Sequence, residues 1–261
     1  MISEAGSWAG SRWNSRKPPE KNKREERENR IKYTYKTGDI QKMRKISSEK
    51  LEQELKRLEQ MREYERKYEE YSVICGIDEA GRGPLAGPVV AAAAVLPKDA
   101  VILWLNDSKK LSERRREELF LEIREKAVAY GVGIVSPAVI DEINILQATY
   151  EAMRQAVSQL PAEPDIFLND AVMIPGIDDK KQVRIIKGDA KSVSIAAASV
   201  LAKVTRDHMM EEYDKLYPEY GFAKHKGYGT KAHMDAIREF GMCPIHRRSF
   251  LTKMDLKNET Q

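Results

Sequence analysis

Four acidic residues that lie far apart in the chain could together hold a divalent cation. Each follows an apolar run of the kind that forms a buried strand, directly or after a short turn; they are Asp78, Glu79, Asp170 and Asp189. Carboxylate oxygens are the ligands that Mg²⁺ and Mn²⁺ prefer. Two such ions about 3.5–4 Å apart can activate a water and stabilise a leaving oxygen. These residue types therefore indicate a metal-assisted reaction.

A glycine-rich segment follows the first acidic pair at once. Gly81, Arg82 and Gly83 place an arginine between two flexible residues, and such a loop can hold a phosphate or a sugar edge with its backbone amides. The spacing to Gly87 fits neither common nucleotide-binding fingerprint, and a tight turn between two strands is the alternative. A metal site and an anion site within six residues suggest cleavage or transfer of a phosphodiester. We call residues 81–87 the glycine loop.

Two further polar segments could contact a nucleic acid. Residues 106–110, which include Ser108 and Lys109, precede an expected helix and could bind phosphate, or simply cap that helix. Residues 224–229, here called the tyrosine loop, place Tyr228 in a basic segment, where it could stack on a sugar and contact a 2′-hydroxyl, or be anchored in the core. Residues 246–248 add a basic patch.

Strands alternate with helices along the chain, which predicts an α/β domain. Strand ends gather functional groups in such sheets. Strands are expected at 72–77, 89–96, 132–135, 165–168 and 183–186, and helices at 48–70, 112–130, 137–160, 190–213 and 231–240.

Each acidic residue also has an ordinary structural explanation. Asp189 could cap the helix after it, and Asp170 could open a turn. Asp78 and Glu79 are adjacent and would face opposite sides of a regular strand. Both reach one site only if the chain leaves extended geometry, which Gly81 and Gly83 permit.

The chain of 261 residues is long enough for one large domain with an appendage. Residues 1–70 carry 19 Lys and Arg against 14 Asp and Glu, so the excess positive charge lies there. Such an appendage would raise affinity for nucleic acid, or be a solvated tail without a partner. No apolar run is long enough to span a membrane, no signal peptide is evident, and both cysteines are expected as buried thiols in a reducing cytoplasm.

Taken together, these segments resemble bacterial ribonuclease HII over residues 72–252. The matching segments are Gly-Ile-Asp-Glu-Ala-Gly-Arg-Gly-Pro-Leu-Ala-Gly-Pro-Val-Val at 76–90, Asn-Asp-Ser-Lys-Lys-Leu-Ser at 106–112, Lys-Gly-Asp-Ala-Lys-Ser at 187–192, Ile-Ala-Ala-Ala-Ser at 195–199, Ala-Lys-Val-Thr-Arg-Asp at 202–207, Lys-His-Lys-Gly-Tyr-Gly-Thr at 224–230 and His-Arg-Arg-Ser-Phe at 246–250. Several ordered motifs are more specific than any one of them.

The resemblance implies an RNase H-like fold, a mixed five-stranded sheet flanked by helices, here with an N-terminal helical extension. It implies a monomer that needs Mn²⁺ or Mg²⁺ and associates with no membrane. The substrates would be RNA–DNA hybrids and duplex DNA containing single ribonucleotides, cut on the 5′ side to leave a 3′-hydroxyl and a 5′-phosphate. Such an activity serves ribonucleotide excision repair and primer removal during DNA replication.

The resemblance also assigns residues. Asp78 would bridge two metal ions, Asp170 and Asp189 would complete their shells, and Glu79 would contribute its side chain or its carbonyl. The backbone of residues 81–83 would contact the 2′-hydroxyl at the RNA-to-DNA junction. The remaining substrate-binding residues would be Ser108, Lys109, which contacts phosphate near the cut, and Tyr228, which stacks on the sugar beyond the junction.

The domain boundaries follow from the same comparison. We expect a basic, disordered tail at 1–46, a helix at 47–70, the catalytic domain at 71–252 and a short tail at 253–261. One departure from the family pattern is Asn169-Asp170-Ala171, where relatives more often have an apolar residue followed by Asp-Gly. This departure leaves open which of Asn169 and Asp170 faces the site.

Three other functions compete with this interpretation. A related nuclease could digest hybrids and ignore single ribonucleotides, although the Gly-Arg-Gly segment argues against it. A binding protein without catalysis could rely on the basic tail, although the four carboxylates argue against that. An enzyme acting on phosphorylated small molecules would leave the tyrosine loop without a role.

Overall fold

A computed structural model of the chain describes residues 47–252, so the predicted tails at 1–46 and 253–261 lie outside the described residues. The sheet has five strands in the order β3-β2-β1-β4-β5. The antiparallel half contains β1, β2 and β3, and β4 and β5 extend it in parallel from β1. The strands are β1 (Ile74–Ala80), β2 (Val89–Val95), β3 (Ala129–Val135), β4 (Ile166–Asp170) and β5 (Gln182–Ile185). The predicted mixed α/β sheet is confirmed.

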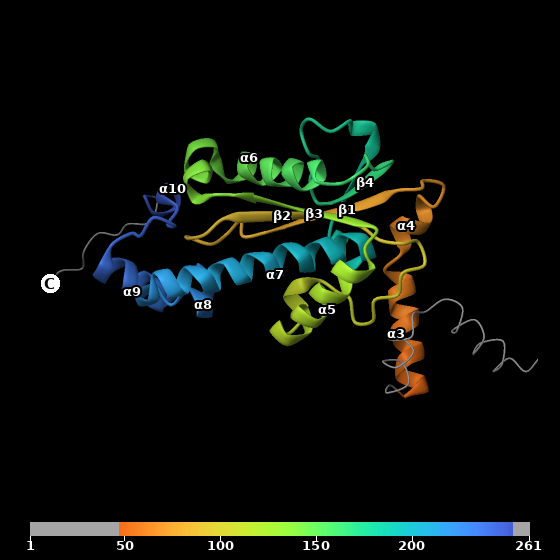
Figure 1. Cartoon of the computed structure of the whole chain (residues 1–261), viewed down its shortest axis with the longest axis horizontal. Coiled ribbons are helices and arrows are strands. Elements are labelled where there is room, and N and C mark those ends of the chain that lie inside the picture. The colour runs from red at the N-terminus through yellow and green to blue at the C-terminus, as the bar shows by residue number, and fades with distance from the viewer. Residues whose placement is uncertain (1–46, 253–261) are drawn as a thin grey trace, which may run out of the picture. The chain divides into compact units, whose positions relative to one another are not determined.

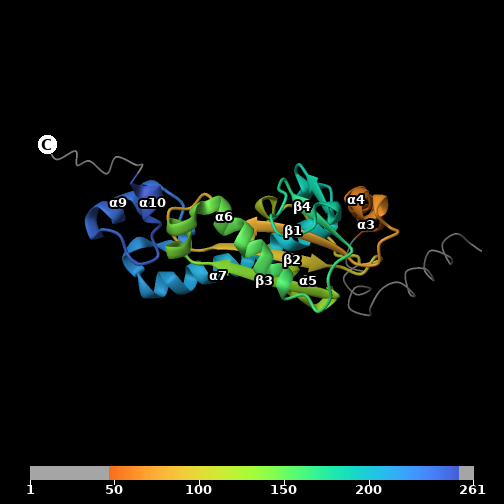
Figure 2. The same cartoon turned by 90° about the horizontal axis from the view of Figure 1, so that it is seen from above.

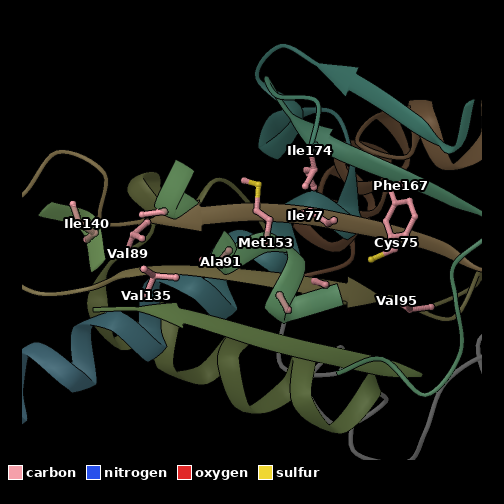
Figure 3. Packing of buried hydrophobic residues seen from close by; sticks show 14 residues of the cluster. Cys75, Ile77, Val89, Ala91, Val95, Val135, Ile140, Met153, Phe167 and Ile174 are labelled. Atoms are coloured by element: carbon pink, nitrogen blue, oxygen red, sulfur yellow. The ribbon is translucent and has the colours of Figure 1, made fainter. Parts of the chain in front are cut away.

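Helices cover both faces of this sheet (Figure 1). One face carries α6 (Pro137–Ser158), and the other carries α7 (Val193–Leu216), with α5 (Glu113–Lys126) packed beside α7. Glycines allow this close approach: a Cβ at Gly133 would lie 1.9 Å from a carbonyl oxygen of α6, and one at Gly76 would lie 2.1 Å from the backbone of α7. Figure 3 shows the core between the sheet and α6, whose buried side chains include Ile77, Val89, Met153 and Phe167.

A smaller cluster closes one end of α7 (Figure 2). It contains the short elements η4 (Pro218–Tyr220), α8 (Phe222–His225), α9 (Lys231–Phe240) and α10 (Arg248–Leu251). Its buried side chains include Met210, Tyr220, Phe222, Ile237 and Leu251. This cluster supports the tyrosine loop, which connects α8 to α9.

The segment before the sheet differs from the single helix predicted over 48–70. The structure has α3 (Ser48–Gln60) and α4 (Glu63–Lys67), separated where Arg62 donates hydrogen bonds to the carbonyls of Lys98 and Ala100. Glu65 then accepts hydrogen bonds from the Ser192 hydroxyl at 2.5 Å and from the Ser194 amide at 3.0 Å. Arg62 thus holds the segment to the loop after β2, and Glu65 holds it to the start of α7.

Other boundaries shift for local reasons. Helix α5 ends before residue 130 because β3 already pairs with β2 from Ala129. Helix α7 begins three residues later than predicted, after the turn η3 (Gly188–Ala190). Two more short turns are η1 (Ser108–Lys110) and η2 (Asp179–Lys181). Among residues 47–252, no helix is long and apolar enough to span a bilayer. Cys75 is buried as expected, whereas Cys243 is only partly buried.

Candidate active site

Asp78 lies near the end of β1 and is buried on the face that α7 covers. Its Oδ1 accepts a hydrogen bond of 2.7 Å from the amide of Glu79. Burial, followed by the charges of Glu79 and Asp170, raises the pKa of Asp78 well above its usual value, although the Ser199 hydroxyl opposes this shift. That hydroxyl also lies 2.9 Å from the hydroxyl of Ser108. Ser108 is therefore two hydrogen bonds from the acidic side chain.

Glu79 belongs to the same site although the strand stays regular. Pairing of β1 with β2 continues to Ala80, so the chain stays extended here. The departure from extended geometry that was expected from the sequence does not occur at Asp78 and Glu79. Burial raises the pKa of Glu79, and Asp170 adds to this, while Arg82 and Lys109 oppose it. Asp170 stands at the sheet end, and its charge acts on both Asp78 and Glu79 without the predicted departure from extended geometry.

Parallel pairing brings Asp170 to Asp78. Ile77 lies opposite Asn169 in β1 and β4, so the next residues along the two strands are Asp78 and Asp170. Adjacent strands lie roughly 4.8 Å apart, which explains the electrostatic coupling of the two carboxylates. The Asp170 Oδ1 also accepts a hydrogen bond of 2.8 Å from the amide of Gly188.

Asn169 and Ala171, where the sequence departs from the family pattern, have separate roles. Asn169 is fully buried, and its amide donates a hydrogen bond of 2.9 Å to Gln182. Because side chains alternate along a strand, Asp170 points to the opposite face, toward Gly188. Ala171 follows with φ 56°, a left-handed conformation that favours glycine. The register ambiguity is thus resolved in favour of Asp170.

Asp189 is buried in η3 and does not cap α7. The cap is Ser192, whose hydroxyl accepts a hydrogen bond of 3.1 Å from the amide of Ile195. Burial, together with the charges of Asp107 and Asp170, raises the pKa of Asp189 to about 6. Asp107 was not predicted as a site residue, because an Asp just before an expected helix is usually a helix cap. Its side chain does accept a hydrogen bond from the amide of Lys109, as a cap would.

We call Asp78, Glu79, Asp170 and Asp189 the acidic cluster, and Asp170 interacts electrostatically with each of the other three. The charge of Asp170 raises the pKa values of the other three, which are Asp78, Glu79 and Asp189. Lys109 faces them: burial alone would lower its pKa, but the surrounding carboxylates outweigh burial and raise it. Among residues 47–252, no three Asp, Glu, His or Cys side chains lie close enough to ligate one ion as they stand. Oxygen-only donors that repel each other suit a hard divalent cation, which relieves that repulsion.

A buried arginine, Arg247, fixes the backbone of the glycine loop by hydrogen bonds. Its guanidinium group donates hydrogen bonds of 2.6–3.1 Å to four backbone carbonyls, those of Gly81, Arg82, Pro84 and Gly87. In a planar trans peptide the N–H points opposite the carbonyl, so the amides of Arg82 and Gly83 face away from Arg247. The predicted basic patch at 246–248 is wrong, since His246 and Arg247 are buried and Arg248 alone is exposed.

A second buried arginine, Arg206 of α7, ties the glycine loop to the tyrosine loop. It donates hydrogen bonds of 2.9–3.0 Å to the carbonyls of Ala86, Pro88 and Lys226. Gly81, at φ 96°, packs on it, and a Cβ there would lie 2.2 Å from the arginine Nε. From the sequence, Arg247 was expected in an exposed basic patch and Arg206 had no predicted role. Both occur in segments that match the family, but residue type alone does not show that a basic side chain is buried.

Tyr228 is exposed, so its side chain is not anchored in the core. About half of its surface, 48%, is accessible. The preceding Gly227 accepts a hydrogen bond of 2.8 Å from the amide of Leu85 in the glycine loop. A Cβ at Gly83 would lie 3.7 Å from Cε1 of the Tyr228 ring. The ring therefore stands beside the outward-facing amides.

The structure brings every predicted site residue into one neighbourhood. The acidic cluster leads directly into the glycine loop through an ion pair of 3.3 Å between Glu79 and Arg82. Lys109 and Ser108 approach the acidic cluster from η1, and Tyr228 approaches the glycine loop from the other end of α7. Carboxylate oxygens thus lie next to amide donors and an exposed aromatic ring, an arrangement suited to cutting a phosphodiester beside a recognised sugar.

Known proteins resemble this chain in sequence and fold. The family described as ribonuclease HII matches residues 75–253. The ribonuclease HII of Lachnoclostridium phytofermentans is 59% identical over 206 residues, which cover 79% of this chain and 81% of that protein. The crystal structure of ribonuclease H2 from Pyrococcus horikoshii OT3 has a TM-score of 0.56 and 30% identity, covering 68% of this chain and 93% of that one. The RNase HII in the PCNA:RNase HII complex from Archaeoglobus fulgidus has a TM-score of 0.58 and 28% identity, covering 72% and 98%.

Proposed function

The chain belongs to the ribonuclease HII family, whose members cleave the RNA of RNA–DNA hybrids, and from this premise we propose that it also cuts duplex DNA at a single ribonucleotide. The cut lies on the 5′ side of the ribonucleotide and leaves a 3′-hydroxyl and a 5′-phosphate. The supporting observation is the continuity of acidic cluster, glycine loop and Tyr228, since it places a sugar-binding surface beside the metal-binding oxygens. Such a cut would start the removal of a ribonucleotide from DNA.

Recognition of one ribose needs few contacts, and the two loops can supply them. The amides of Arg82 and Gly83 face away from Arg247 and can donate hydrogen bonds to a 2′-hydroxyl. The Tyr228 ring can stack on the neighbouring sugar. Because these contacts involve one 2′-hydroxyl and the neighbouring sugar and no run of ribonucleotides, the same surface serves a hybrid and an isolated ribonucleotide.

The carboxylates of the acidic cluster would bind a pair of divalent cations, Mg²⁺ or Mn²⁺, which would relieve their mutual repulsion. Asp78, whose pKa is raised by the charges of both Glu79 and Asp170, would hold both ions, and Asp189 would add a ligand from η3. When bound, two such ions supply an activated water and stabilise the leaving oxygen.

Lys109 and Ser108 orient the phosphate from η1. The carboxylates keep Lys109 charged, so its ammonium group can bind the phosphate oxygens next to the cut. The hydrogen bond between Ser108 and Ser199 holds η1 against α7, which fixes the position of Lys109.

A cleavage assay with three matched duplexes tests this proposal. One duplex carries a single ribonucleotide, one is all DNA, and one pairs RNA with DNA; each is incubated with Mg²⁺, with Mn²⁺ and with chelator. We expect the first and third to be cut with either metal, neither with chelator, and mapped ends that show a 3′-hydroxyl 5′ of the ribonucleotide. Cleavage of the hybrid alone would favour the nuclease that ignores single ribonucleotides, and binding without cleavage would favour a non-catalytic binding protein.

A further inference from the structure

A buried pair of histidines lies directly beneath the tyrosine loop. His233, from α9, is fully buried, and its Nδ1 lies 2.9 Å from the carbonyl oxygen of Tyr228. Its Nε2 lies 3.0 Å from the Nε2 of His246, which is 3% exposed. The other ring nitrogen of His246, Nδ1, lies 2.9 Å from the amide of Cys243 and 3.1 Å from its sulfur. Four groups thus form one line of hydrogen bonds.

The two groups at the ends of this line determine which nitrogen of each histidine ring carries a hydrogen. The carbonyl of Tyr228 can only accept, so Nδ1 of His233 must carry a hydrogen. The amide of Cys243 can only donate, so Nδ1 of His246 must be bare. Both rings are neutral if His246 donates from its Nε2 to the bare Nε2 of His233. The arrangement therefore selects one tautomer for each ring.

Charging either ring would break the line. A proton added to His233 would set two N–H groups against each other at the contact between the rings, and one added to His246 would oppose the amide of Cys243. His225 stacks on His233 at 4.5 Å and leaves little room for a rearrangement. Burial lowers the pKa of His233 to about 4 and also lowers that of His246, which agrees with two neutral rings near pH 7.

We propose that His233 and His246 are positioning residues for Tyr228, and this inference rests on the proposed role of Tyr228 at the ribose. His246 is followed by Arg247, which holds the carbonyls of the glycine loop. Adjacent residues of one short segment therefore fix both recognition elements, the outward amides directly and the tyrosine through His233. The separation between the aromatic ring and the amides is set by this segment.

Two substitutions of His233 separate its two contacts. Asparagine places an amide nitrogen near the position of Nδ1, so His233→Asn keeps the donor to Tyr228 and loses the contact with His246. Glutamine places its amide near the position of Nε2, so His233→Gln keeps the contact with His246 and loses the donor to Tyr228. Both variants remove the same buried ring, and equal midpoints of thermal unfolding would establish them as a matched pair.

Binding is measured in chelator for duplex DNA with one ribonucleotide and for the same duplex without it. We expect His233→Gln to weaken binding to the ribonucleotide duplex roughly fivefold, and His233→Asn to weaken it less than about twofold, because one hydrogen bond to the Tyr228 backbone is lost in the first alone. In a Tyr228→Ala background, His233→Gln should add nothing. Equal effects of the two variants, or a full effect of His233→Gln without the tyrosine ring, would overturn the inference.

The tautomers themselves give a readout independent of binding. Nitrogen chemical shifts should show His233 protonated at Nδ1 and His246 at Nε2 at neutral pH, and the opposite assignment would refute the inference. If Tyr228→Ala alone leaves binding unchanged, the proposed role of the tyrosine fails, and the positioning role fails with it. If Tyr228→Ala weakens binding and His233→Gln does not, the positioning role alone fails.

Discussion

The acidic cluster contains buried charges that repel one another, whereas the buried charges beneath the glycine loop and the tyrosine loop have hydrogen-bond partners. In the acidic cluster, carboxylates raise one another's pKa values, so the ionised form is disfavoured in the folded protein. In the loops, the buried cations of Arg206 and Arg247 are satisfied by backbone carbonyls. Burial lowers their pKa values to about 10 and about 9, yet both stay charged at neutral pH.

Because of this difference, removing a charge should change the stability of the fold in opposite directions in the two regions. The carboxylates of the acidic cluster repel one another, so removing one of these charges should stabilise the fold, and under the proposed function it should end activity. The loops are complete without a ligand, and removing one of their charges should destabilise the fold, because several carbonyls lose their donors at once. Each prediction below tests one side of this contrast.

The largest effect is expected for Asp78→Asn. Cleavage of either substrate should fall by about a thousandfold or more, because the metal contribution is worth several kcal/mol. In chelator at pH 7, the free energy of unfolding should rise, because a buried charge with a raised pKa has been removed. Asp141, whose pKa is lowered mainly by hydrogen bonds from Ser249, is the control: Asp141→Asn should lower stability. An Asp78→Asn protein that still cleaves would contradict the metal mechanism.

The pH dependence of stability is expected to depend on Asp189. Its pKa is raised to about 6 in the folded chain, so between pH 4 and pH 6 the native state binds more protons than the unfolded state. This contribution to the free energy of unfolding is present at low pH and is lost as the pH rises through about 6. The loss should be on the order of 1–2 kcal/mol, because solvent screens part of the repulsion that raises this pKa.

Urea unfolding in chelator from pH 4 to pH 7 would measure it. The wild-type free energy should fall more steeply with pH than that of Asp189→Asn, because the variant has no titrating group there. Saturating Mn²⁺ should flatten the wild-type curve, since the cation replaces the proton as partner of the carboxylate. Parallel curves for the two proteins would mean that neither burial nor the neighbouring carboxylates raise the pKa of Asp189.

On the loop side, Arg247→Lys keeps a positive charge and loses the planar set of donors. It cannot hold the carbonyls that orient the amides of Arg82 and Gly83, so kcat/KM for the single-ribonucleotide duplex should fall roughly tenfold. Arg206→Lys is the comparison variant, equally buried but bound to the carbonyls of Ala86, Pro88 and Lys226 instead of those that orient the amides of Arg82 and Gly83. It should show a similar fall in Tm and a smaller fall in kcat/KM. Equal losses in both variants would mean that the amide orientation is irrelevant to recognition.

The two regions were also unequally predictable from the sequence. The acidic residues could be identified because their chemistry is carried by residue type and by position at strand ends. Arg247 could not, because a basic residue is normally exposed, and its carbonyl partners near Gly81 lie more than 160 positions earlier in the chain. A role for the histidine pair was equally hidden, since it depends on which ring nitrogens meet.

Contacts that are distant in the sequence explain the remaining differences. The fold class followed from alternating strands and helices, which are local patterns. The break after α3 depends on the carbonyls of Lys98 and Ala100, which no local pattern reveals. The face of Asp170 depended on the register with β1, which became clear only when Ile77 was found opposite Asn169.

The smallest effect, and the sharpest test of the loop, is expected for Gly83→Ala. Gly83 lacks the left-handed conformation of Gly81, and a methyl group there would stand 3.7 Å from the Tyr228 ring, an ordinary contact. Stability should therefore change by less than about 0.5 kcal/mol. The same methyl group would lie between the outward amides and the ring, where the proposed ribose approaches, so binding of the single-ribonucleotide duplex should weaken severalfold.

Gly81→Ala supplies the contrast within the same loop. At φ 96°, with Arg206 Nε only 2.2 Å from the new Cβ, it should lower Tm clearly, whatever the substrate. Calorimetry and equilibrium binding on both variants separate the two effects. A Gly83→Ala protein that binds with wild-type affinity would show that no sugar approaches the loop at this point, and the recognition role would then have to lie with Tyr228 alone.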